Sequence, residues 1–83
     1  MLLKLKSNVF IDRLTLEVYA AEPCLLKAIL RDDAGCVCSA METPVDTQPQ
    51  TFNWNGLNDL PYGVYFLEVN GDDEKKMRLV KRV

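Results

Sequence analysis

The sequence predicts an all-β fold, a small antiparallel β-sandwich of six or seven strands. Apolar and polar residues alternate with period two in several short segments, and Gly, Pro, Asn and Asp residues separate these segments at a fairly regular spacing. Almost no segment shows a helical period. A series of short strands with such turn signals is typical of a sandwich. We therefore expect a single domain that spans residues 1–83.

The N-terminal part of the chain contains three predicted strands and a bend. Leu3–Lys6 is a short edge strand, and Leu14–Tyr19 and Cys24–Arg31 are longer strands with one apolar face. Residues 7–13 between the first two form a bend, which we expect to place Phe10 in the core. A helix is the alternative for Cys24–Arg31, because its residues are good helix formers, but the segment is short and its neighbours are predicted strands.

The rest of the chain alternates between turns and further strands. Gly35 and Asn55-Gly56 supply turn residues, and Pro61 marks the entry to a strand because proline donates no ladder hydrogen bond. The predicted strands are Cys36–Met41, Gln50–Trp54, Gly63–Val69 and Lys75–Val83. A hairpin turn at 32–35, a polar loop at Glu42–Pro49 and a hairpin turn at Asn70–Asp73 separate them. In the last strand, Met77 and Leu79 lie on one side, and Arg78, Val80 and Arg82 lie on the other.

Two sets of residues have both a structural and a functional interpretation. Trp54 is expected in the core with Phe52, although an exposed tryptophan could bind sugar. The three cysteines are expected to act as small hydrophobic residues, with Cys38 buried. Cys36 and Cys38 lie two apart on one face of a strand, and Cys24 should fall opposite Thr43, so no pair is well placed to form a disulfide. A structural disulfide or a redox role is the alternative.

Composition and charge exclude several classes of function. The formal net charge is −2, so no basic field recruits nucleic acid. No apolar run approaches the roughly 18 residues that a membrane helix needs, so we expect no membrane-spanning segment. The segment Met1–Lys6 is charged too early for a signal peptide. The chain is therefore either cytoplasmic or part of a larger protein that carries the export signal elsewhere.

The sequence lacks the residue patterns of an enzyme. It contains no histidine, and its only serines, Ser7 and Ser39, lack a nucleophile-elbow context. The carboxylates of Asp32-Asp33 and 72–74 lie in predicted hairpin turns; we expect them to be solvated turn residues, with a weak calcium site as the alternative. We expect no catalysis, no metal, no cofactor and no small-molecule substrate.

Several motifs in the sequence resemble one family. Leu60–Leu67 (LPYGVYFL), followed by the basic segment Lys75–Lys81 (KKMRLVK), resembles the end of the C-terminal sorting domains of the type IX secretion system, which close exported proteins of Bacteroidetes. Ser7–Val18, Leu30–Cys38 and Asn55–Leu57 resemble earlier motifs of that family in the same order. The chain departs from the usual pattern of the family at three positions: Val9, Arg31 and Cys36.

The resemblance implies an immunoglobulin-like sandwich at the end of a cargo protein. Outer-membrane secretion machinery would recognise it and deliver the cargo to the cell surface or outside the cell. The implied recognition surface lies on the last two strands and consists of Gly63, Val64, Tyr65, Lys75, Lys76, Lys81 and Arg82. Alternation places Tyr65 in the core, so the basic residues are the better candidates for contact.

Three alternatives to this interpretation are open. Charge alone favours a simpler explanation of the basic end, namely a solubilising edge strand that discourages association between sheets. The functional alternative from charge is a docking stripe for an acidic partner or an anionic surface, formed by Lys75, Lys76, Arg78, Lys81 and Arg82. The chain could also be an accessory module that binds carbohydrate or protein through an exposed Trp54 or Tyr19. Finally, it could be a small stand-alone sandwich, with Met1 as its true start.

Overall fold

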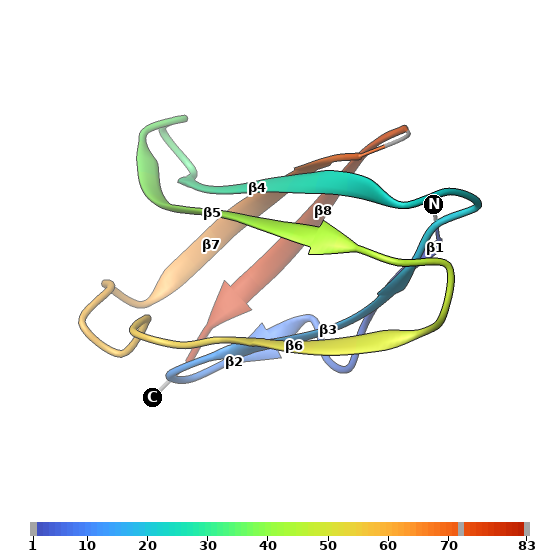
Figure 1. The fold of residues 1–83 in the computed structure, drawn as a ribbon. Helices are drawn as coiled ribbons and strands as arrows, with labels where there is room; N and C mark the ends of the chain where they lie inside the picture. Colours follow the sequence, from blue (N-terminus) through green and yellow to red (C-terminus); the bar gives the residue numbers. More distant parts are fainter. Residues whose placement is uncertain (1, 72, 83) are drawn as a thin grey trace.

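The computed structural model describes residues 2–71 and 73–82, which form two packed β-sheets (Figure 1). Alternating apolar residues explain most of the strands, since each strand turns one apolar face to the other sheet. The strands in chain order are β1 (Leu2–Leu5), β2 (Val9–Phe10), β3 (Leu14–Tyr19), β4 (Cys24–Asp32), β5 (Val37–Val45), β6 (Gln50–Trp54), β7 (Gly63–Asn70) and β8 (Glu74–Lys81).

The order of the strands within the sheets is that of an immunoglobulin-like sandwich. The three-stranded sheet has the order β1-β3-β6, and the five-stranded sheet has the order β2-β8-β7-β4-β5. Immunoglobulin-like domains place strands A, B and E in one sheet and G, F and C in the other, with C′ at the edge in some members. Here β1, β3 and β6 correspond to A, B and E, and β8, β7, β4 and β5 correspond to G, F, C and C′. The predicted fold class is confirmed.

Two parts of the predicted strand pattern are wrong. The bend predicted at residues 7–13 contains β2, which pairs in parallel with the end of β8, so the sheet is not purely antiparallel. The loop predicted from Glu42 begins later, because β5 continues through Pro44 to Val45. A proline fits there because β5 is an edge strand of its sheet, where one side of the backbone needs no partner.

The hairpin between β4 and β5 also differs from the prediction. Cys24 lies opposite Val45, two residues beyond the predicted partner Thr43: the turn already pairs Arg31 with Val37 where the prediction had Cys36, and a register shift between Leu30 and Arg31 adds the second residue. A bulge of this kind inserts an unpaired residue into one strand and displaces all later pairs. The three cysteines are free, and Cys36 lies exposed before β5 starts. Cys38 is half-buried, so the prediction of a buried Cys38 holds only in part.

The core lies between the two sheets and takes side chains from both. Phe10 is buried, as predicted for the bend, and its ring meets the ring of Tyr65 edge to face at 5.8 Å between centroids. Trp54 is also buried, with 6% of its surface exposed, and Phe52 is half-buried against the core. The other buried apolar residues are Leu3, Leu14, Leu16, Val18, Ala20, Leu26, Ala28, Leu30, Val45, Leu57, Leu67, Val69 and Leu79.

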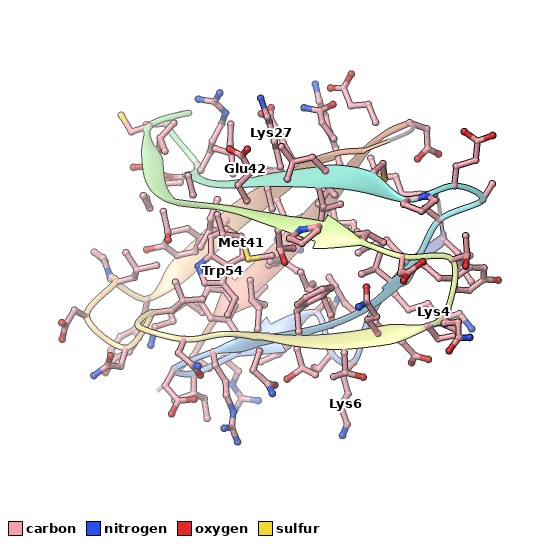
Figure 2. All side chains as sticks on the ribbon, in the orientation of Figure 1. Lys4, Lys6, Lys27, Met41, Glu42 and Trp54 are labelled. Atoms are coloured by element: carbon pink, nitrogen blue, oxygen red, sulfur yellow. The ribbon has the colours of Figure 1, made fainter. Side chains whose placement is uncertain are left out.

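One polar contact joins the two sheets along the flank formed by β5 and β6. The indole Nε1 of Trp54 on β6 donates a hydrogen bond of 3.1 Å to the hydroxyl oxygen of Ser39 on β5. Figure 2 shows Trp54 and Met41 between these two strands. Since a buried indole N–H requires an acceptor, this contact satisfies the polar group of an otherwise apolar side chain.

Candidate functional site

The residues of the predicted recognition surface lie on the hairpin of β7 and β8. The two strands pair from Gly63 opposite Lys81 to Asn70 opposite Glu74. Because side chains alternate between the faces of a sheet, the hairpin divides these residues into an inner group and an outer group. The inner group is Tyr65, Lys75 and Lys81, and the outer group is Val64, Lys76 and Arg82.

Tyr65 is a core residue that anchors the start of β7. Its hydroxyl donates a 2.6 Å hydrogen bond to the carbonyl oxygen of Pro61, four residues earlier. Immunoglobulin-like domains use a similar tyrosine corner near the start of strand F. Gly63, between these residues, has φ +144°, a conformation that favours glycine. Gly63 and Tyr65 therefore shape the hairpin, and Tyr65 is not available for contact with a partner.

Burial raises the pKa of the Tyr65 phenol, and nearby Cys38, Asp32 and Asp33 raise it further. The phenol therefore remains a neutral hydrogen-bond donor at physiological pH. Burial also raises the pKa of the Cys38 thiol, with Asp32 adding to the effect. A thiol in this state is a poor nucleophile, because the thiolate is the reactive form.

We expect Tyr65→Phe to lower the free energy of unfolding at neutral pH by about 0.5–1.5 kcal/mol, the usual net contribution of one hydrogen bond. Because the folded-state pKa of this phenol is raised, its contribution is fully present below the unfolded-state pKa of about 10 and is lost as pH rises further. Urea unfolding at neutral and strongly alkaline pH measures both effects. The Cys38 thiol is present in both proteins, so the difference between them isolates the phenol. If the parent protein and Tyr65→Phe lost equal amounts of stability above about pH 10, the alkaline loss could not be assigned to the Tyr65 phenol.

Lys81 points into the protein and is the one buried charged residue among those that the structure describes, with 3% of its surface exposed. Its ammonium group lies 5.3 Å from the ring centroid of Tyr62, a cation–π geometry. Lys75 is half-buried on the same side of β8, and its ammonium lies 3.9 Å from a carboxylate oxygen of Asp73. Two of the predicted basic contacts are therefore on the inner side of the strand.

The outer face of the hairpin carries other basic residues and an exposed aromatic ring. Phe66 on β7 is 40% exposed and lies between Arg78 on β8 and Arg31 on β4 in the sheet register. The next row toward the end of β8 is apolar, with Val9, Val80 and Val64 on adjacent strands. Exposed apolar side chains beside arginines resemble the centre of many protein-binding interfaces.

Glu68 partly neutralises this surface. Its carboxylate accepts a 3.1 Å hydrogen bond from the Nε of Arg31, and it lies 3.9 Å from the ammonium of Lys76. In residues 2–71 and 73–82, no carboxylate within ion-pair distance of Arg78 or Arg82 is recorded. These two arginines are therefore the least compensated charges on the outer face.

Sequence reasoning missed Phe66 and Arg31 as members of this surface. Arg78 was part of the basic stripe recognised from charge but not of the surface implied by the resemblance, although it lies on the same side of β8 as Lys76. Arg31 and Phe66 are 35 residues apart in the chain, and only the pairing of β4 with β7 makes them neighbours. No local pattern in the sequence indicates that pairing. We call Val9, Val64, Val80, Phe66, Arg31, Lys76, Arg78 and Arg82 the outer surface.

The other candidate sites take structural roles where they are described. The Asp32 carboxylate accepts hydrogen bonds from the backbone N–H groups of Ala34 and Cys36, at 3.0 and 2.9 Å, and so stabilises its hairpin turn. Asp72 of the second acidic cluster lies outside the described residues, as does Val83 of the last predicted strand. Within the described parts, no group of three His, Cys, Asp or Glu side chains is arranged to hold a metal ion. Over the same residues, no helix is long and apolar enough to span a membrane.

Comparison with known proteins adds no identity: no family model, no curated protein and no solved structure matches this chain.

Proposed function

We propose that this chain is a non-catalytic sorting module, which directs a larger protein to the cell surface through type IX secretion. The ordered motifs that resemble the sorting-domain family support the proposal, and an immunoglobulin-like sandwich is the fold that this resemblance implies. Sorting needs a stable recognition surface on the cargo and no active site.

The outer surface is the observation on which the proposal rests. Most of it lies on the hairpin of β7 and β8, which carries two of the motifs that resemble the family, and it presents Lys76, Arg78 and Arg82 beside an exposed Phe66. We propose that the secretion machinery contacts these residues. Lys75 and Lys81 then act mainly in packing, since both point inward.

A reporter experiment tests the role of this surface. Residues 1–83 are fused to the end of a periplasmic reporter in a bacterium with a type IX system, and surface reporter is quantified by protease accessibility and immunoblotting. We expect surface delivery, and we expect the triple variant Lys76→Glu, Arg78→Glu, Arg82→Glu to reduce it by about tenfold or more, because reversed rim charges repel an acidic partner.

A control variant with the same change in charge separates recognition from net charge. Lys4, Lys6 and Arg13 are exposed and none of them belongs to the hairpin of β7 and β8. Lys4 is in β1 of the three-stranded sheet and Lys6 directly follows that strand, as Figure 2 shows, and Arg13 is in the loop between β2 and β3. Their replacement by Glu should leave delivery within about twofold of the parent. Circular dichroism and thermal unfolding check that both variants fold. Retention of the parent fusion in the periplasm would refute the proposal, and equal loss in the two variants would refute the site.

The second candidate function is an accessory module that binds another protein. It is favoured by the exposed Phe66 between Arg31 and Arg78, which does not require any role in secretion. A carbohydrate platform at Trp54 is not compatible with the burial of that residue, so a sugar-binding role would depend on the exposed Tyr19. Retention of the reporter with a folded module would favour the protein-binding role.

A further inference from the structure

Residues 74–79, the first part of β8, have an unpaired edge within the five-stranded sheet. On one side β8 pairs with β7 along its whole length, from Glu74 to Lys81. On the other side it pairs with β2 at Val80 and Lys81 alone, among the residues that the structure describes. Residues 74–79 of β8 therefore have a strand neighbour on one side only.

The backbone groups at this edge can be assigned from the pairing with β2. The N–H of Val80 donates to the carbonyl oxygen of Asn8, and the N–H of Arg82 donates to that of Phe10, both at 2.9 Å. Alternate residues of a strand direct their N–H and C=O groups to alternate sides. Lys76 and Arg78 are four and two residues, or two alternations and one, away from Val80 in the same strand. Their backbone N–H and C=O groups therefore point to the same side as those of Val80, which is the unpaired side of residues 74–79.

The side chains around this edge restrict which strand could be added. Lys76 and Arg78 project on the outer face and are exposed, whereas Met77 projects inward, where it is half-buried against the core. A second copy of β8 would bring lysines and arginines against each other, which is unfavourable for cross-strand pairs. Glu74 on the outer face, 3.9 Å from the ammonium of Lys76, and Lys75 on the inner face lie at the start of this edge. Along residues 76–79, a strand with acidic residues on the outer face and apolar residues on the inner face would complement both sides.

The other long edge of this sheet is less suitable. On β5, Pro44 has no N–H to donate, and the register shift between Leu30 and Arg31 disturbs the opposite end of the β4–β5 pair. Residues 74–79 of β8 contain no proline, and their pairing with β7 is regular.

We propose that the unpaired edge of β8 binds an extended segment with alternating acidic and apolar residues, which extends the five-stranded sheet. The segment forms main-chain hydrogen bonds with Lys76 and Arg78, its acidic side chains lie beside their cationic groups, and its apolar side chains cover Met77. This inference does not depend on the proposed role in secretion, and a chain that is exported but does not bind such a segment would overturn this inference alone.

Amide hydrogen exchange followed by NMR tests the open edge in the intact chain. In the free protein, the N–H groups of Lys76 and Arg78 should exchange at least about tenfold faster than those of Met77 and Leu79, which face β7. Addition of the peptide acetyl-Thr-Glu-Val-Glu-Val-Glu-Thr-amide should slow the exchange of Lys76 and Arg78 by about tenfold or more. Protection of these two amides in the free protein, or no slowing with the peptide, would overturn the proposal.

Two controls separate charge from strand pairing. The same peptide with Lys in place of each Glu should not slow the exchange, and equal effects of the two peptides would overturn the acidic specificity. Lys76→Gln keeps the backbone N–H, whereas Lys76→Pro removes it without removing a hydrogen bond to β7. We expect Lys76→Gln to retain more affinity than Lys76→Pro when peptide-induced chemical shifts are titrated. Equal affinities would show that the main chain takes no part.

Discussion

Leu26→Ala is expected to lower the free energy of unfolding by about 2–5 kcal/mol, whereas Leu25→Ala should change it by less than about 1 kcal/mol. The two leucines are neighbours on β4, and the substitution is identical. Leu26 is fully buried between the sheets, while Leu25 is 49% exposed on the outer face. Removing the buried side chain leaves a cavity that the rest of the core fills only in part.

This pair of variants tests the sandwich directly. Urea unfolding followed by circular dichroism measures both stabilities, and the slope of the transition checks that the denatured state is unchanged. In a domain of this size, the loss at Leu26 is a large share of the total stability. Similar losses for the two variants would contradict the inward and outward alternation of β4, and would favour the helix considered for this segment.

Trp54→Ala should destabilise the protein by about 3–5 kcal/mol, because a buried indole fills a large volume on the flank between β5 and β6. The hydrogen bond from its Nε1 to the Ser39 hydroxyl contributes a smaller part. Ser39→Ala removes that acceptor and should cost about 1–3 kcal/mol, the range expected when a buried donor is left unpaired.

Fluorescence and denaturation distinguish the two parts of the Trp54 contribution. Trp54 is the single tryptophan of the chain, so its emission reports this site alone. In the parent and in Ser39→Ala, the emission should be that of a buried indole and should shift to longer wavelength on unfolding. If the native protein showed the emission of a solvent-exposed indole, Trp54 would not be in the core. If Ser39→Ala lowered the free energy of unfolding as much as Trp54→Ala does, the hydrogen bond and not the packing of the indole would account for most of the stabilisation.

The local alternation of residues predicted much of the fold. The predicted bounds of Leu14–Tyr19 and Gln50–Trp54 agree with β3 and β6, and Phe10 and Trp54 are in the core as expected. These features depend on which face of its own strand a residue occupies. The alternation of apolar and polar residues along the strand indicates that face directly. The same rule could have identified Lys81 as an inward residue, since it shares the parity of Met77 and Leu79.

The pattern of residues along the chain is enough to predict short strands around one core, and to predict which side chains of most strands face that core. The neighbours of each strand follow from the folded arrangement alone: β2 beside the end of β8, Pro44 within an edge strand, and Arg31 beside Phe66. Alternation is a property of neighbouring residues in the chain, whereas pairing depends on the packing of segments far apart in the sequence. The outer surface and the open edge of β8 both arise from that pairing.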